Sequence, residues 1–280
     1  MTTIKVTKMQ GCGNDFAVVD YSEYKKTGLE LSEFAKKICD RHFGIGADGL
    51  IIPKTFEVEP AEIGWFFYNS DGTTAQMCGN GMRCFAKYVT DKKLICKKKF
   101  SVKTGAGIIK PEIQDDGNVR VNMSSPVLEP EKIPFKGQGK CKIKILDKEF
   151  EINPVSMGNP HCVIFTNDDV FEMANTYGKY IESHKLFPEK TNVEFVKIKS
   201  KNEIDFCVYE RGCGITLACG TGACASVAAG VLNGLTDTFV KVNLLGGTVF
   251  VDWGNHKQNK DENIFLIGPA NYVYEADYIV

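Results

Sequence analysis

The sequence lacks the features that mark membrane, secreted and nucleic-acid-binding proteins. No apolar run approaches the roughly 18 residues of a bilayer span, and the first residues lack the long apolar stretch of a secretory signal. Lys and Arg number 34 against 35 Asp and Glu, so the net charge is −1 and no positive excess is available to neutralise a phosphate backbone. We therefore expect a soluble, cytoplasmic globular protein that binds neither a membrane nor nucleic acid.

Several motifs of common enzyme and metal sites are also missing. The phosphate-loop, H-E-x-x-H and G-x-S-x-G patterns do not occur, and the four His residues are scattered without ligand spacing. Cysteine is plentiful, but the 11 residues form no C-x-x-C pair. An odd count without that spacing argues against a disulfide framework and against a zinc ribbon. We expect no bound metal and assign most thiols to packing as small hydrophobic groups.

One G-x-G-x-x-G match is present at residues 44–49, but its surroundings are reversed. A dinucleotide fingerprint follows a strand and opens a helix, whereas residues 31–42 look helical and residues 50–52 look like a strand. The sequence therefore predicts a glycine-rich turn from a helix to a strand here, rather than a nucleotide site.

Two Cys-Gly-x-Gly stretches lie half a chain apart, at 78–81 and 219–222, an offset of 141 residues. A second pair, Gly-Asn at 13–14 and at 158–159, has an offset of 145 residues, and each member precedes an apolar run. Two ordered matches at offsets near half of the 280-residue length favour duplication over chance. The chain is therefore predicted to hold two diverged copies of one unit, which agrees with the usual allowance of about 150 residues per domain.

In each copy the cysteine stands between strand-like and helix-like sequence. Residues 64–69 are aromatic and strand-like, and residues 82–89 carry apolar side chains at helical spacing. Residues 206–209 and 223–231 repeat this plan in the second copy. We therefore predict that both cysteines lie at helix N-termini, in a chain where strands outnumber helices.

A helix N-terminus bears directly on thiol chemistry. Its unpaired N–H groups and positive dipole end stabilise an anion, so we expect a lowered pKa for Cys78 and Cys219. The glycines after each cysteine would let a substrate carboxylate approach bare N–H groups. Two such thiols, brought to one cleft by pseudosymmetric copies, suit inversion of a carbon, because one group removes a proton from one face and the other delivers a proton to the opposite face.

Six motifs in order make the sequence resemble the diaminopimelate epimerase family. They span nearly the whole chain, at residues 8–16, 44–49, 69–84, 156–161, 191–195 and 210–223. The resemblance implies an isomerase that interconverts LL- and meso-2,6-diaminopimelate for lysine and peptidoglycan precursor biosynthesis. It also implies a homodimer that uses neither pyridoxal phosphate nor any other cofactor.

The fold implied by the resemblance is of the α/β (α+β) class, with two pseudosymmetric domains and the active site in the cleft between them. Each domain is expected to be a curved, mostly antiparallel sheet or barrel around a central helix. We place the N-terminal lobe at residues 1–123 plus 265–280 and the C-terminal lobe at residues 124–264.

The same resemblance assigns roles by position. Cys78 and Cys219 would be the catalytic acid/base pair. The carboxylate at the reacting centre would be bound by backbone N–H groups of Gly79, Asn80, Gly220 and Thr221. The distal carboxylate would be bound by Asn69, Asn159, Asn192 and Arg211, since Arg offers a planar fork to a carboxylate. Asn14 and Glu210 would orient the distal ammonium or the closed site, and His161 would position the reacting centre.

Four positions depart from the usual family pattern, and none of them carries an assigned role. They are Gln10, Cys12, Cys213 and Ile215, where His, an aliphatic residue, Ala and Glu are usual. Two other functions remain open at this point. One is a sister two-base enzyme, such as a proline or hydroxyproline racemase or a phenazine-type isomerase. The other is a thiol redox or metal-binding protein that uses several of the cysteines.

Overall fold

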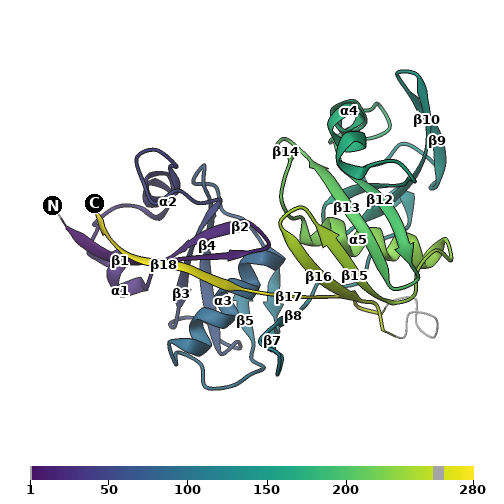
Figure 1. Cartoon of the computed structure of the whole chain (residues 1–280). Helices are drawn as coiled ribbons and strands as arrows, with labels where there is room; N and C mark the ends of the chain where they lie inside the picture. Colours follow the sequence, from purple (N-terminus) through teal and green to yellow (C-terminus); the bar gives the residue numbers. More distant parts are fainter. Residues whose placement is uncertain (1, 255–261) are drawn as a thin grey trace. The chain divides into compact units, whose positions relative to one another are not determined.

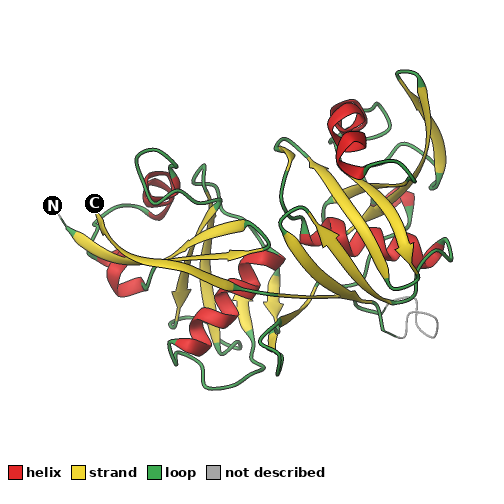
Figure 2. Cartoon of the chain, in the orientation of Figure 1, coloured by secondary structure: helices red, strands yellow, loops and turns green. Residues whose placement is uncertain are grey.

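The structure is a computed structural model that describes residues 2–254 and 262–280. The chain forms two compact units, Met1–Val121 with Gly268–Val280, and Asn122–Ile267. Strands dominate both units, as Figure 2 shows.

The first unit is built on a sheet with the strand order β18-β1-β2-β3-β4-β5-β6. Its elements are β1 (Thr3–Gly11), β2 (Asn14–Val18), α1 (Tyr21–Lys25), α2 (Leu31–Cys39), β3 (Gly49–Lys54), β4 (Ile63–Asn69), α3 (Gly79–Asp91), β5 (Val102–Thr104), β6 (Gly107–Ile109), β7 (Glu112–Ile113), β8 (Val119–Asn122) and β18 (Asn271–Ile279). The helix α2 covers β3 and β4, and its apolar side chains Phe34, Ala35 and Ile38 pack into the core beneath it.

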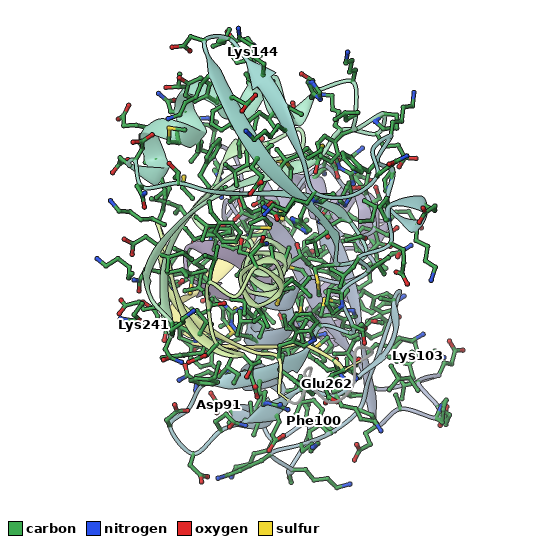
Figure 3. The ribbon with its side chains drawn as sticks, turned by 90° about the vertical axis from the view of Figure 1, so that its right-hand side faces the viewer. Asp91, Phe100, Lys103, Lys144, Lys241 and Glu262 are labelled. Carbon is green, nitrogen blue, oxygen red and sulfur yellow. The ribbon has the colours of Figure 1, made fainter. Side chains whose placement is uncertain are left out.

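The second unit is built on strands in the order β17-β16-β15-β13-β12-β11-β10-β9. Its elements are the 3-10 turn η1 (Pro130–Lys132), β9 (Cys141–Ile145), β10 (Lys148–Ser156), β11 (Pro160–Phe165), α4 (Val170–Glu182), β12 (Asn192–Ser200), β13 (Glu203–Glu210), β14 (Gly214–Ile215), α5 (Gly220–Leu232), β15 (Phe239–Leu244), β16 (Gly247–Asp252) and β17 (Phe265–Gly268). Lys144 lies near the tip of the β9–β10 hairpin (Figure 3).

The two units share one pattern of strand pairing. From β1 to β6, successive pairs are antiparallel, parallel, antiparallel, parallel and antiparallel. The same series recurs from β10 through β11, β12, β13 and β15 to β16. This repeat supports the duplication predicted from the sequence, and it makes α3 and α5 equivalent, because each connects a parallel pair. The expected class is confirmed as mixed α+β with mostly antiparallel sheets, and closure into a barrel stays a prediction.

The equivalent helices α3 and α5 lie at the centre of their units. The helix α3 packs on β1, β2 and β3, and α5 packs on β10, β11, β12 and β16 (Figure 1). Every residue of α5 from Gly222 to Gly230 is buried, which is typical of a helix enclosed on all sides. Each N-terminus is thereby fixed by the core of its unit.

The glycine-rich stretch at residues 44–49 is a turn between α2 and β3, as predicted. Gly46 has a φ of 75°, a left-handed conformation that glycine adopts without strain. The turn places Asp48 beside the start of β2, where its carboxylate contacts Asn14.

Candidate active site

Cys78 and Cys219 occupy the same position in the two units, the N-cap of the central helix. Cys78 caps α3 with extended backbone angles, and Cys219 caps α5 in the same way. Each Sγ accepts a hydrogen bond from the N–H three residues later, Gly81 or Gly222, at 3.4 Å. The prediction that both cysteines begin helices is confirmed, and both sulfurs lie where unpaired N–H groups gather.

The glycines that follow the two cysteines differ in how much space they have. A Cβ built at Gly222 would lie 2.8 Å from Oε1 of Glu194 and 3.3 Å from Sγ of Cys219. A Cβ at Gly81 would lie 3.5 Å from its nearest neighbours, which is ordinary contact. The second helix start is therefore the more closely packed of the two.

In the first unit, the thiol of Cys78 is joined to two asparagine side chains. Its S–H donates to Oδ1 of Asn14 at 3.6 Å, and the same oxygen accepts from Nδ2 of Asn80 at 3.2 Å. Asn69 stands at the end of β4, where its Nδ2 donates to the Thr73 hydroxyl at 3.0 Å. The structure thus brings Asn14, Asn80 and Cys78 together, whereas Asn69 is bonded within its own turn.

In the second unit, a chain of polar side chains leads from the Cys219 sulfur into the core. Sγ lies 3.5 Å from the hydroxyl of Thr221, which accepts from Nδ2 of Asn159 at 3.4 Å. Oδ1 of Asn159 lies 3.0 Å from Nε2 of His161. Nδ1 of His161 in turn lies 2.6 Å from Oε1 of Glu194. His161 therefore acts on the helix start through Asn159.

The expectation of a lowered pKa is wrong for Cys219. Burial raises the pKa of this thiol well above its usual value, and the nearby carboxylates of Glu210 and Glu194 raise it further. Hydrogen bonds from Thr221 and Gly222 lower the pKa, but they are the smaller influences. Burial disfavours a thiolate here, and the two carboxylates disfavour it further, whereas the hydrogen bonds at the helix N-terminus favour it less strongly than burial opposes it.

Glu210, Asn192 and Arg211 gather where β13 ends and β12 begins. Burial raises the pKa of Glu210, against hydrogen bonds from Thr216 and Cys219 that lower it. Oδ1 of Asn192 accepts the backbone N–H of Arg211 at 2.9 Å, and the Arg211 guanidinium donates to the Glu189 carbonyl at 3.2 Å. Asn192 and Arg211 are therefore neighbours.

Three polar residues at these helix starts received no role from the sequence. They are Asp48, Arg83 and Glu194, which contact Asn14, Asn80 and His161 respectively. Glu194 could have been noticed, because a carboxylate between Val193 and Phe195 interrupts an apolar strand. The contacts of the other two depend on chain reversals that the sequence pattern does not specify.

Within residues 2–254 and 262–280, no group of three or more His, Cys, Asp or Glu side chains is arranged to bind a metal ion. No described helix combines the length and the apolarity needed to cross a bilayer.

The fold of two duplicated units is similar to that of solved phenazine biosynthesis proteins and a hydroxyproline epimerase. A phenazine biosynthesis protein of the PhzF family from Bacillus anthracis matches with a TM-score of 0.71 and 16% identity, covering 100% of both chains. A hydroxyproline epimerase from Agrobacterium vitis, solved with bound trans-4-hydroxy-L-proline, matches with a TM-score of 0.70 and 10% identity, covering 99% of this chain and 92% of that one. At these identities, the likeness shows the fold alone.

Sequence relatives identify the family. The family model for diaminopimelate epimerase matches residues 6–129 and 154–273. A diaminopimelate epimerase from Halothermothrix orenii is 44% identical over 287 residues, covering 99% of this chain and 98% of that protein. One from Carboxydothermus hydrogenoformans is 45% identical over 279 residues, covering 98% of each. The chain belongs to the diaminopimelate epimerase family, and it is an isomerase.

Proposed function

We propose that this protein interconverts LL- and meso-2,6-diaminopimelate without a cofactor, with Cys78 and Cys219 as the acid/base pair. The observation that carries the proposal is the equivalence of the two thiols. Each caps the central helix of its unit, and each accepts an N–H bond at 3.4 Å from a glycine in the first turn. Two copies of one acid/base group suit the inversion of a carbon, because one removes a proton from one face and the other delivers a proton to the opposite face.

The reaction moves two protons and no other group. One sulfur, as a thiolate, takes the α-proton, and the electron pair of the C–H bond delocalises toward the adjacent carboxylate. The other sulfur, as a thiol, delivers its proton to the opposite face of the carbon. Because its pKa is raised, Cys219 enters the reaction holding a proton and is suited to deliver it while Cys78 acts as the base. The reverse reaction exchanges these roles.

Binding of the substrate would use the helix starts and the polar residues around them. We assign the reacting carboxylate to the N–H groups of Gly79, Asn80, Gly220 and Thr221, which lie in the first turns of α3 and α5. We assign the distal carboxylate to Asn69, Asn159, Asn192 and Arg211. Asn14 and Glu210 would orient the distal ammonium. The contact between Asn192 and Arg211 supports this grouping.

A hydrogen-exchange assay tests the proposed function. LL-diaminopimelate in D₂O should gain α-deuterium and form the meso isomer without added pyridoxal phosphate or metal. Cys78→Ala and Cys219→Ala should each lose activity by at least about a hundredfold, the usual scale for one acid/base group. Cys96→Ala, at an exposed position, should keep wild-type activity. Retained epimerisation in both active-site variants, or turnover of proline in place of diaminopimelate, would exclude the proposal.

We also infer a homodimer, from the resemblance and from the edge of the first sheet. β18 is the terminal strand in the sheet order, and its side chains Tyr272, Val273 and Tyr274 are exposed. An exposed edge strand is a template for pairing with another chain. Light scattering after size-exclusion chromatography should give twice the 31.0 kDa chain mass, and a monomer at assay concentration would contradict the inference. We also propose a cytoplasmic location, as expected from the sequence.

A further inference from the structure

Asn14 is held by three partners at once, and the three fix which way its amide faces. Its Oδ1 accepts the S–H of Cys78 and an N–H of Asn80, at 3.6 and 3.2 Å. Its Nδ2 donates to Oδ2 of Asp48 at 2.7 Å. Turning the amide over would set oxygen against the Asp48 carboxylate, which accepts hydrogen bonds when ionised and cannot donate them.

Asp48 is itself held in place for this contact. Its Oδ1 accepts from the guanidinium of Arg41 at 2.7 Å, and its Oδ2 also accepts the backbone N–H of Asp15 at 3.1 Å. Arg41 bonds to both oxygens of Asp15, at 3.2 and 2.9 Å. Both carboxylate oxygens of Asp48 are therefore held, and Oδ2 is directed at the amide nitrogen of Asn14.

On its other side, Asn14 is contacted by Asn80, whose side chain favours the same orientation of the Asn14 amide. Arg83 is fully buried, and its Nη1 donates to Oδ1 of Asn80 at 2.8 Å while its Nε donates to the carbonyl of Pro269 at 3.0 Å. A guanidinium only donates, so Asn80 must turn its nitrogen toward Asn14. Gly11 leaves room for this packing, because a Cβ there would lie 2.8 Å from Nη2 of Arg83.

We propose that Asp48 is a positioning residue that keeps Cys78 protonated until substrate engages Asn14. With its amide locked, Asn14 offers Cys78 an acceptor oxygen, which binds a thiol and repels a thiolate. If substrate draws Asn14 away, the Cys78 sulfur still accepts the N–H bond at the helix N-terminus but no longer faces Oδ1 of Asn14. The thiol then releases its proton to solvent. The catalytic consequence depends on the proposed function, whereas the effect on the resting thiol does not.

Charged and titratable groups from at least three elements lie near Cys78. The helix α3 contributes Arg83 and Cys84, and the turn after β1 contributes Cys12, whose sulfur lies 3.9 Å from Nη2 of Arg83. Asp48 faces the site from the turn before β3. Burial raises the pKa of Cys12, against the lowering influence of Arg83, and burial raises the pKa of Cys84 to about 12. Of these groups, Asp48 is the one that bonds to the side chain facing the Cys78 sulfur.

The test is the pH dependence of iodoacetamide alkylation at Cys78 in the substrate-free protein. Trypsin cleavage after Arg83 separates Cys78 from Cys84, so mass spectrometry reports each thiol alone. In Asp48→Asn the new amide can donate or accept, so only the bond from Asn80 still favours the original orientation, and Asn14 turns its nitrogen to the sulfur more readily. The midpoint of alkylation should fall by about one pH unit, which is about a tenfold faster reaction below the midpoint.

Charge loss alone would also favour a thiolate, so controls must separate charge from orientation. Asp15→Asn removes an equal charge from the same Arg41 cluster without touching the Asn14 side chain, and it should shift the midpoint much less. Asp48→Glu keeps the carboxylate and should resemble the wild type. Asp48→Ser, whose hydroxyl donates or accepts, should act like Asp48→Asn and serves if that variant fails to fold.

A double-mutant cycle with Asn14→Ala decides between the two explanations. If Asp48 acts through the amide, adding Asp48→Asn to Asn14→Ala should leave the midpoint unchanged. If Asp48→Asn shifts the alkylation midpoint of Cys78 as much in the Asn14→Ala variant as in the wild type, the proposal is wrong. It is also wrong if Asp48→Asn and Asp15→Asn shift this midpoint equally. The assay needs no substrate, so its failure is distinct from a failure of the epimerase assignment. In the active enzyme, kcat/KM should rise with pH as the catalytic base of the free enzyme loses its proton. This rise should occur at lower pH in Asp48→Asn than in the wild type.

Discussion

Oε1 of Glu194 lies 2.6 Å from Nδ1 of His161, and both side chains are completely excluded from solvent. Asn159 donates its Nδ2 to Thr221, so its oxygen faces Nε2 of His161 and requires a proton on that nitrogen. A second proton must then lie between Nδ1 and Glu194, on one atom or the other. Oε2 of Glu194 has no hydrogen-bond partner among the described residues.

Replacing Glu194 with glutamine should make Cys219 easier to ionise. The carboxylate of Glu194 raises the pKa of Cys219, so its loss should lower that pKa and speed alkylation of Cys219 at a fixed pH. Epimerisation should fall, because His161 loses the carboxylate partner that fixes its ring and keeps at most a neutral amide oxygen in its place. Mass spectrometry of alkylated peptides measures the first effect. Glu189→Gln, at an exposed position, is the control. Unchanged alkylation of Cys219 in Glu194→Gln would show that the carboxylate does not act on the thiol.

Gly222→Ala and Gly81→Ala form a matched pair at equivalent positions of α5 and α3. The new methyl at position 222 meets Glu194 at 2.8 Å and Phe206 at 3.2 Å, so it should destabilise the fold by about 1–3 kcal/mol, the usual cost of overpacking. At position 81 the nearest atoms lie 3.5 Å away, and alanine should be neutral or stabilising by up to about 1 kcal/mol. Urea unfolding measures both. Equal effects would contradict the packing difference between the two helix starts.

The sequence predicted what depends on local pattern. Cys78 and Cys219 were assigned to helix starts because a strand-like run, a glycine turn and a helical apolar stripe follow one another in each copy, and these signals are read within about 20 residues. The turn at residues 44–49 was assigned for the same reason. The α+β class and the duplication were predicted from the two offsets and from the family motifs.

What the sequence did not predict depends on distant contacts. The raised pKa of Cys219 comes from burial and from Glu210 and Glu194, which only the folded β12 and β13 bring near the helix start. The position of Cys219 at a helix N-terminus predicted a lowered pKa, because the local sequence pattern does not indicate how deeply the thiol is buried. Asp48 received no role for a similar reason, since it lies 34 residues from Asn14 along the chain.

Asp15 should make the stability of the first unit depend on pH in the acid range. Burial opposes ionisation of Asp15, but hydrogen bonds from Arg41 and Lys8 outweigh it and lower the pKa from 3.8 to about 2. A carboxyl whose pKa is lower in the folded state stabilises the fold above its unfolded pKa of about 3.9, and this contribution is lost as the pH falls toward 2. The free energy of unfolding should therefore drop by roughly 2 kcal/mol over that window in the wild type.

In Asp15→Asn this part of the drop should be missing, whereas Asp116→Asn, at an exposed turn, should keep it. Urea unfolding at pH 6, 4 and 3 measures the difference. Parallel pH profiles for Asp15→Asn and the wild type would show that the cluster of Lys8, Asp15 and Arg41 does not stabilise the folded unit.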